Sequence, residues 1–453
     1  MIATEDSPPH TDAADQVKAA TRTRLIVFSD DWGRHPSSCQ HLIAQLLPRY
    51  EVLWVNTIGT RAPRLSWEDV GKVFTKLWQW VRPPQKAAPA SVGLPADIDH
   101  AAALKHLTVV SPKMYPGFRR GWQRRFNAKR MCNAIHKALG PRTEGEKRVA
   151  ITTVPITADL PGKLDVDRWV YYCVDDFSVW PGLDGNVLDT MDRELATKAD
   201  AIVAVSQTLR DRIAAWQCQS VLLTHGIDLS HWRQETGDRG QGTGERSQES
   251  GDRRQEEQSA IRHPHSAIDS GHRTQDTGLP EWWRKLVRPI FLFWGVVDQR
   301  LDVAWCKALA GQGTLVLMGP QQSPDESLMR TKNIVMPGPM PYDELPALAR
   351  SADVLVMPYA DLPVTRAIQP LKFKEYLATG RPVITRKLPA TVEWSDAADV
   401  LDSVESLVAT AKVRAIEGTP PEQVAARKRL SDESWTAKAT VLEKAILGEG
   451  GGE

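Results

Sequence analysis

The chain is 453 residues long, which is enough for two or three domains that each bury a hydrophobic core. Its formal net charge is +1 and its pI is about 7.7, so no strong overall field attracts nucleic acid, and we expect no nucleic-acid partner. The five cysteines are scattered without a CxxC pair or a zinc spacing, and we expect reduced thiols in the cytoplasm.

The chain begins with a polar segment and then alternates strand-like and helix-like segments. Residues 1–22 lack the apolar core of a signal peptide, and we expect a disordered N-terminus. The expected strands are residues 25–29, 52–55, 107–110, 149–153, 169–173, 201–205 and 221–224, and the expected helices are 37–47, 126–139, 189–198 and 207–216. Near-continuous Val, Ile and Leu runs are typical of parallel strands buried on both faces. Residues 23–232 are therefore predicted to form one doubly wound α/β domain.

A polar segment interrupts this pattern. Residues 233–278 contain no Phe, Tyr, Trp or Lys and are rich in Gly, Arg, Asp, Glu, Ser and Gln. Such a composition cannot bury enough apolar surface to offset the entropy lost on ordering. We interpret residues 233–280 as a disordered insert between two domains.

A second doubly wound domain is expected over residues 281–425. Its predicted strands are residues 290–294, 315–318, 334–336, 354–357 and 383–384, with helices between them, such as 342–350. A proline-rich break at 419–421 precedes an amphipathic helix at 431–447, within a C-terminal segment of residues 426–453. Ligands of open α/β sheets bind at the carboxyl ends of the strands. Two such domains facing a cleft suit a transfer between two substrates.

The most informative segment is residues 352–385, ADVLVMPYADLPVTRAIQPLKFKEYLATGRPVIT, which predicts a strand, a loop, a helix and a strand. Pro370 suits the first turn of the helix, and Gly380 its end. The free backbone N–H groups at the helix start, with Lys372 nearby, would bind an anion such as a diphosphate. Glu375 would accept hydrogen bonds from sugar hydroxyls. The alternative is an ordinary surface helix with both side chains solvated.

This segment resembles the donor-binding helix of family 4 glycosyltransferases of the GT-B fold, of the teichuronic-acid and exopolysaccharide type. The resemblance lies in PLKFKEYLATGRPVI, and Gln369 completes a glutamine-proline-leucine-lysine helix start. It implies two Rossmann-like domains facing a cleft, with a C-terminal helix that crosses back onto the first domain. It also implies a nucleotide-diphosphate sugar as co-substrate, a retaining reaction, and neither a metal nor another cofactor.

The donor site that the resemblance implies departs from the family pattern in two places. In FLFWGVVDQRLD, residues 291–302, Gly295 ends a strand and Arg300 is the only basic residue, where the family usually has an arginine and a lysine. A structural turn would explain both residues equally well. Many members also have a second glutamate, whose position before Glu375 is occupied here by Ala367. Tyr359, at the end of the preceding strand, completes the predicted donor-binding set.

Two segments of the first domain are predicted to face the acceptor. Asp175 and Asp176 follow a buried strand in YYCVDDFSVWP, residues 171–181, which resembles the valine-aspartate-aspartate of the same subgroup. Neighbouring side chains diverge, so one would orient or deprotonate an acceptor hydroxyl while the other caps the next turn; capping by both is the alternative. In SDDWGRH, residues 29–35, Asp30, Asp31 and His35 are expected at the cleft edge, with Asp31 and His35 predicted on the acceptor side, although a lone loop histidine is more often solvated.

A basic, aromatic segment precedes these residues. Residues 113–130, KMYPGFRRGWQRRFNAKR, hold seven Lys or Arg, four aromatic residues and no acid, and residues 74–80 add FTKLWQW. This composition predicts contact with the inner face of the cytoplasmic membrane. A solvated helix face and a nucleic-acid patch are the alternatives.

Taken together, these features predict a glycosyltransferase that moves a sugar from a nucleotide diphosphate to a hydroxyl of a surface glycan or lipid-linked acceptor. A nucleotide-sugar 2-epimerase of the same fold and a non-catalytic GT-B scaffold are the alternatives.

Overall fold

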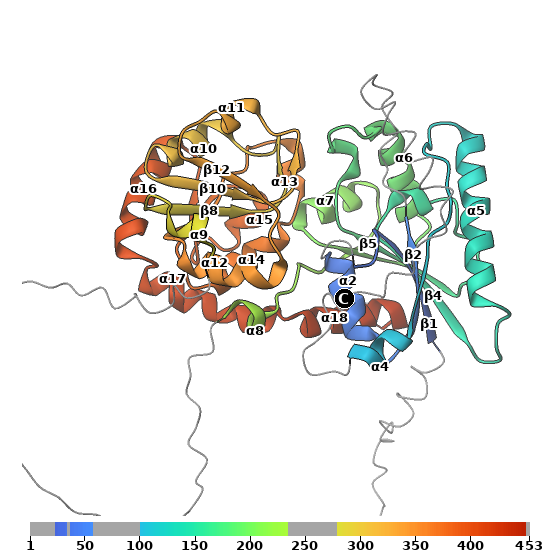
Figure 1. Ribbon diagram of the computed structural model, residues 1–453. Coiled ribbons are helices and arrows are strands. Elements are labelled where there is room, and N and C mark those ends of the chain that lie inside the picture. The colour runs from blue at the N-terminus through green and yellow to red at the C-terminus, as the bar shows by residue number, and fades with distance from the viewer. Residues whose placement is uncertain (1–22, 34–36, 58–99, 234–278, 450–453) are drawn as a thin grey trace, which may run out of the picture.

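The computed structural model describes residues 23–33, 37–57, 100–233 and 279–449, and Figure 1 shows them as two α/β units side by side. Each unit has its own sheet and its own hydrophobic core. The disorder expected for residues 1–22 lies outside the described residues, as do His35 and residues 74–80. Of the insert expected at 233–280, only Arg233, Leu279 and Pro280 are described, and Leu279 is buried in the second unit.

The first unit is built on a parallel sheet with the order β3-β2-β1-β4-β5-β6-β7. Its strands are β1 (Thr23–Ser29), β2 (Glu51–Asn56), β3 (Leu107–Val110), β4 (Lys147–Thr152), β5 (Arg168–Cys173), β6 (Ala201–Ala204) and β7 (Val221–Leu222). Its helices are α2 (Ser38–Leu46), α4 (His100–Lys105), α5 (Gly121–Leu139), α6 (Gly185–Ala196) and α7 (Gln207–Ala215), with 3-10 turns η2 (Pro155–Thr157) and η3 (Phe177–Val179). The central strands are almost wholly buried, as their apolar runs predict.

The second unit is built on a parallel sheet with the order β12-β10-β8-β13-β14-β15. Its strands are β8 (Ile290–Trp294), β10 (Thr314–Met318), β12 (Ile334–Gly338), β13 (Val354–Met357), β14 (Val383–Arg386) and β15 (Asp399–Leu401), with a small pair, β9 (Val297–Asp298) and β11 (Gln321–Gln322). Its helices are α9 (Glu281–Arg284), α10 (Val303–Ala310), α11 (Glu326–Met329), α12 (Leu345–Ser351), α13 (Pro363–Ala367), α14 (Leu371–Ala378), α15 (Pro389–Val392), α16 (Val404–Glu417) and α17 (Pro421–Ala426), with 3-10 turns η4 (Tyr342–Glu344) and η5 (Arg427–Glu433).

The C-terminal helix α18 (Trp435–Leu447) crosses back to the first unit, where it packs against α2, β5 and β6 (Figure 1). Trp435 stacks on His41 with ring centres 4.6 Å apart, and the Tyr50 hydroxyl donates to Glu443 at 2.6 Å. The predicted fold class, two doubly wound domains with a returning helix, is confirmed.

The two crossings between the units run next to each other. Ile227 forms a bridge with Ser434, just after β7 and just before α18, and α8 (Leu229–Trp232) follows the first crossing. Lys374 of α14 is buried here, donating to the His225 carbonyl at 2.5 Å and pairing with Glu433. The second unit is therefore tied to both connections.

Several element boundaries differ from expectation: the helix expected at 126–139 is α5 (Gly121–Leu139), and the one expected at 189–198 is α6 (Gly185–Ala196). The strand expected at 221–224 is only Val221–Leu222, because the chain then leaves the sheet for the crossing. The helix expected at 342–350 begins at Leu345, where Pro346 fits the first turn, after the 3-10 turn η4. The helix expected at 431–447 begins at Trp435, because Ser434 is extended and caps it by accepting from the Ala437 N–H.

Candidate functional site

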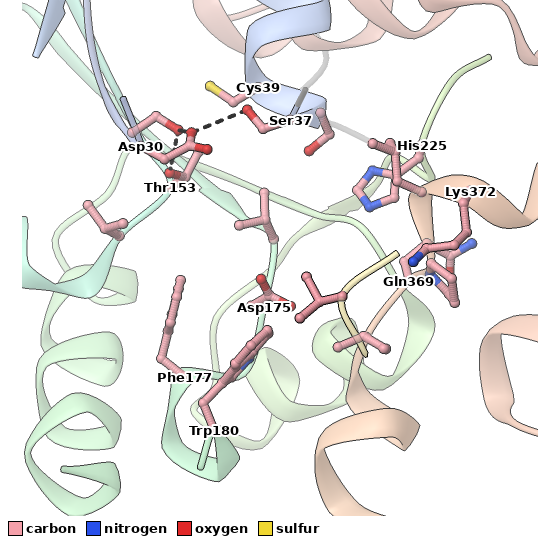
Figure 2. Close-up of a pocket in the computed structure, with 18 of the residues that line it drawn as sticks. Asp30, Ser37, Cys39, Thr153, Asp175, Phe177, Trp180, His225, Gln369 and Lys372 are labelled. Carbon is pink, nitrogen blue, oxygen red and sulfur yellow. Dashed lines mark hydrogen bonds between the residues drawn. The ribbon is translucent and has the colours of Figure 1, made fainter. Parts of the chain in front are cut away.

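A cavity of about 600 Å³ lies between the two units and is lined by both (Figure 2). The first unit contributes the carboxyl ends of β1, β4 and β5 and the start of α2. The second contributes the loops after β8 and β13 and the turn that opens α14. The predicted site residues in its wall are Asp31, Asp175, Arg300, Tyr359, Gln369 and Lys372. Both sets of strand ends thus meet at one cavity, as the tandem arrangement predicts.

The turn at residues 368–372 forms the second-unit side of the cavity. Pro370 is the cap residue of α14, with extended backbone, and the helix begins at Leu371. The backbone N–H groups of Leu371 and Lys372 are in the first helical turn, where no intrahelical acceptor exists. In Figure 2, Gln369 and Lys372 lie across the cavity from Asp30 and Asp175. This turn offers free donors and a positive helix end to an anion.

The ammonium of Lys372 is placed by close packing against β8 and the end of β13. Its Nζ lies 4.9 Å from the ring centre of Phe293 and 5.9 Å from that of Tyr359. A Cβ atom on Gly295 would lie 1.7 Å from this Nζ, and Gly295 also has φ +142°. Gly295 is not part of the cavity wall; it leaves the space that Lys372 occupies.

Arg300 reaches the cavity from the loop after β9. Its guanidinium pairs with Asp298 at 2.8 Å and lies 5.1 Å from the ring centre of Trp180 in the first unit. Arg300 was interpreted either as a donor-binding residue or as part of a structural turn. In the structure it forms a local ion pair in the turn and also lines the cavity. Its positive charge also lowers the pKa of Asp175, although less than burial raises it.

The two adjacent aspartates after β5 point in different directions, as expected for neighbouring residues of an extended segment. Asp175 lines the cavity, and its burial raises its pKa to about 7. Asp176 caps the turn η3 by accepting from the Ser178 N–H at 3.0 Å, and it pairs with Arg212 at 3.3 Å. Asp176 lies outside the cavity wall, so the structure brings only Asp175 to the site.

Glu375 lies inside the second unit rather than in the cavity wall. Its carboxylate accepts hydrogen bonds from the Tyr342 hydroxyl at 2.9 Å and the Trp294 indole N–H at 3.3 Å. Burial raises the pKa of Glu375 to about 7. A sugar hydroxyl would therefore have to displace Tyr342 or Trp294 to reach this carboxylate.

Phe177, Trp180 and His225 lie in the cavity wall but were not in the predicted set, whereas Asp30, also in the wall, was expected at the cleft edge. The Asp30 carboxylate accepts from the hydroxyls of Ser29 and Ser37. Burial lowers the pKa of His225 to about 3, with Lys374 adding to the effect, so this imidazole is neutral. Phe177, Trp180 and His225 each follow a strand or a turn that was recognised, but no sequence pattern indicated that their side chains converge on the cavity.

Nothing in the described ranges suits a metal or a membrane span. They contain no group of three or more His, Cys, Asp and Glu residues arranged to hold a metal ion. No helix in these ranges has the length and apolarity needed to cross a bilayer.

The second unit matches a known family. Residues 297–415 match the family model described as glycosyl transferases group 1. TuaH of Bacillus subtilis (strain 168), assigned by its name to teichuronic acid biosynthesis as a glycosyltransferase, is 33% identical over 106 residues. That match covers 22% of this chain and 27% of TuaH, so it spans about a quarter of the relative.

Solved structures resemble the whole chain. Sucrose-phosphate synthase from Thermosynechococcus elongatus has a TM-score of 0.61 at 13% identity, covering 94% of this chain and 99% of that chain. HepE of Anabaena, in complex with UDP and glucose, has a TM-score of 0.58 at 11% identity, with the same coverage of 94% and 99%. At such identities the likeness shows the fold alone. The chain therefore has the GT-B fold, and residues 297–415 of its second unit match the glycosyl transferases group 1 family, in agreement with the resemblance seen in the sequence.

Proposed function

We propose that this protein is a glycosyltransferase that uses a nucleotide-diphosphate sugar as donor. The observation that carries the proposal is the arrangement across one cavity. The anion-binding turn at residues 369–372 faces a carboxylate with a raised pKa, that of Asp175, from the other unit. The group 1 family match over the second unit and the name of TuaH support the same reaction class.

The donor diphosphate would bind at the start of α14. In the reaction the bond between the anomeric carbon and the diphosphate oxygen breaks, and negative charge grows on the leaving group. The N–H groups of Leu371 and Lys372, the Lys372 ammonium and the Arg300 guanidinium would stabilise that charge. Because two protein cations face the leaving group, we propose that transfer needs no metal ion. Gln369 and Tyr359 would contact the donor from the same wall.

The acceptor would approach from the first unit. Its hydroxyl oxygen forms the new bond to the anomeric carbon, and Asp175 would orient this hydroxyl and take its proton. A pKa of about 7 suits a group that takes a proton near neutral pH. Asp176 would hold the turn that carries Asp175, and Asp31 would border the acceptor. A retaining outcome rests on the family resemblance.

A membrane acceptor is supported by one surface of the first unit. Trp122 and Phe126, one turn apart on α5, are 49% and 48% exposed, and Tyr115 packs beside Trp122. Arg119 and Arg124 are paired with acids, whereas Arg120, Arg125 and Lys129 make no ion pair with the described residues. We propose that this surface, residues 113–130, docks on the inner face of the cytoplasmic membrane. The acceptor would then be a lipid-linked or surface glycan.

The function can be tested with the purified protein. Uridine, guanosine and adenosine diphosphates are added in a thermal-shift series, because a ligand that binds the native state raises the melting temperature. Labelled nucleotide sugars with the base that binds are then incubated with and without acceptors. A glycosyltransferase labels an acceptor, whereas a 2-epimerase would alter the sugar without one. If no nucleotide diphosphate raises the melting temperature, a scaffold is favoured and the proposal fails.

A further inference from the structure

The two halves of the cavity wall differ in chemistry. Among the described residues, the cations Arg300 and Lys372 both come from the second unit, whereas the first unit contributes carboxylates, hydroxyls, the rings of Phe177 and Trp180 and the neutral imidazole of His225. We propose that the first-unit half binds an uncharged sugar ring of the acceptor, with Asp30 accepting hydrogen bonds from its hydroxyls and Phe177 covering its apolar face. This inference rests on the proposed function and deepens it by naming the acceptor class.

Two serine hydroxyls fix the position of the Asp30 carboxylate, and both donate to the same carboxylate oxygen. The Ser29 hydroxyl donates to its Oδ1 at 2.9 Å, and the Ser37 hydroxyl donates to the same atom at 3.2 Å. Thr153 holds Ser29 in turn, through a hydroxyl contact of 3.0 Å. The carboxylate also accepts a hydrogen bond from its own backbone N–H. No side chain among the described residues donates to Oδ2, and this is the atom that would accept from a ligand hydroxyl. In Figure 2, Asp30, Ser37 and Thr153 form one side of the cavity.

An aromatic surface lies on the turn that follows Asp175. Phe177 and Trp180 both line the cavity and are partly exposed (Figure 2). The Arg300 guanidinium lies over the ring of Trp180, whereas Phe177 packs against the first-unit core and remains partly exposed at the cavity. A pyranose has an apolar C–H face and a rim of hydroxyls, so it matches an aromatic ring beside fixed hydrogen-bond acceptors.

The same lining disfavours an anionic ring. Asp30, Asp31 and Asp175 all line this half of the cavity, and burial already raises the pKa values of Asp30 and Asp175. A further carboxylate or phosphate placed among them would be repelled and would lose its hydration. A neutral sugar instead supplies hydroxyl donors, which stabilise the ionised carboxylates. The end of the acceptor that enters the cavity is therefore neutral, whatever charge the rest of it carries.

Ligand-observed saturation-transfer NMR tests this on the full chain, with the nucleotide diphosphate found in the thermal-shift series present throughout. The probes are the methyl glycosides of glucose, galactose, mannose and N-acetylglucosamine, and the methyl glycosides of glucuronic and galacturonic acid. At least one neutral glycoside should bind tenfold or more tightly than either uronate. Asp30→Asn and Phe177→Leu should each weaken that binding about tenfold. Asp165→Asn, which removes an exposed carboxylate of the same unit, is the matched control and should leave it unchanged.

Melting temperatures and nucleotide affinities of the variants distinguish loss of the subsite from loss of the fold. The inference is overturned if a uronate binds as tightly as the neutral glycosides, if none of the neutral glycosides binds, or if Asp30→Asn and Phe177→Leu both bind like the wild type. In each of these cases nucleotide binding would persist, so the proposed function would stand. Failure of the wild type to bind any nucleotide diphosphate would instead remove the proposed function.

Discussion

At the scale of single residues, Lys372 is the side chain on which donor binding should depend most. Lys372 lines the cavity from the first turn of α14, and its ammonium has no acidic partner at ion-pair distance among the described residues. A hydrogen bond to a charged group contributes about 1.5–3 kcal/mol, and about 1.4 kcal/mol is a factor of ten in affinity. We expect Lys372→Ala to weaken binding of the nucleotide diphosphate by about tenfold or more in isothermal titration calorimetry. Lys307→Ala, an exposed lysine of α10, should leave the affinity unchanged.

Glu375 should behave differently from Lys372. Both of its carboxylate oxygens already accept hydrogen bonds inside the second unit, from Tyr342 and Trp294. We expect Glu375→Gln to lower the melting temperature but to reduce nucleotide affinity less than Lys372→Ala does, because Gln cannot satisfy both donors equally well. Calorimetry of the two variants side by side measures this. A tenfold loss of affinity with an unchanged melting temperature would instead place this carboxylate on the donor.

Asp175 should make the stability of the protein depend on pH. Burial raises its pKa to about 7, above the value of about 3.9 for an unfolded chain, so the folded state keeps a proton that the unfolded state has lost. Wild-type stability therefore contains a contribution that falls as the pH rises from about 4 to about 7. Asp175→Asn lacks this titrating carboxyl group. The melting temperature of the variant minus that of the wild type should therefore increase between pH 5 and pH 8. A difference that stays constant over this range would contradict the raised pKa.

These residues also show which parts of the candidate site could be predicted from the sequence. Lys372, Arg300 and Asp175 were identifiable because each follows a recognisable apolar strand or opens a helix, at the sheet edge where ligands bind. The sequence could not distinguish Asp175 from Asp176, since the division depends on which one the Ser178 N–H and Arg212 contact. Nor could it place Glu375, whose direction is set by Tyr342, more than thirty positions away in the chain.

At the scale of elements, the end of β8 and the start of α14 pack closely against each other. Gly295 has a left-handed φ of +142°, and a Cβ there would fall on the Lys372 ammonium. Because a lysine side chain is flexible, we expect Gly295→Ala to displace that ammonium, weakening nucleotide affinity several-fold in calorimetry and lowering the melting temperature through backbone strain. Gly121→Ala, at a position where a Cβ meets open space, is the matched control. An unchanged nucleotide affinity in Gly295→Ala would show that Gly295 does not help to position the Lys372 ammonium for anion binding.

Elements that contain a continuous apolar run were predictable, and two elements without one were missed. The predicted bounds of the buried strands β8 and β13 and of the partly exposed strand β3 match the structure, because each holds a short apolar run of strand length. The edge strand β15 and the helix α16 were missed, since β15 is only partly buried and α16 is largely exposed with few core residues. Their positions depend on packing against the rest of the sheet rather than on a local pattern.

At the scale of the whole molecule, the sequence predicted the two domains and the returning helix but not how the domains meet. The amphipathic pattern of α18 predicted that one face of this helix packs against the rest of the chain. In the structure this face packs against α2 and the strands β5 and β6. The crossing is fixed by contacts between residues that are far apart in the sequence. Gly226 packs against the ring of Trp435, and the buried Lys374 contacts both segments that connect the two units. The shape of the cavity follows from these long-range contacts, which is why its lining was only partly predicted.

The orientation of the whole molecule on a membrane gives the last prediction. α5 lies on the side of the first unit away from the second (Figure 1), so residues 113–130 can meet a surface while the cavity stays between the units. Burying an apolar side chain gives about 1.5–3 kcal/mol, and a basic residue near an anionic surface gives about 1 kcal/mol. We expect the Trp122→Ser, Phe126→Ser double variant to bind anionic phosphatidylglycerol vesicles at least about tenfold more weakly than wild type in co-sedimentation.

The control for this experiment is Val413→Ser, Ile416→Ser, which removes another exposed apolar pair, 42% and 86% exposed, from α16 of the second unit. It should co-sediment like the wild type, because α16 belongs to the unit that is expected to face the nucleotide sugar rather than the bilayer. Wild-type binding should also fall as salt is raised, since Arg120, Arg125 and Lys129 would act through screened charge. Equal binding to neutral vesicles, or equal loss in both double variants, would show that residues 113–130 do not dock the protein, and the acceptor would then have to reach the cavity without help from the membrane surface.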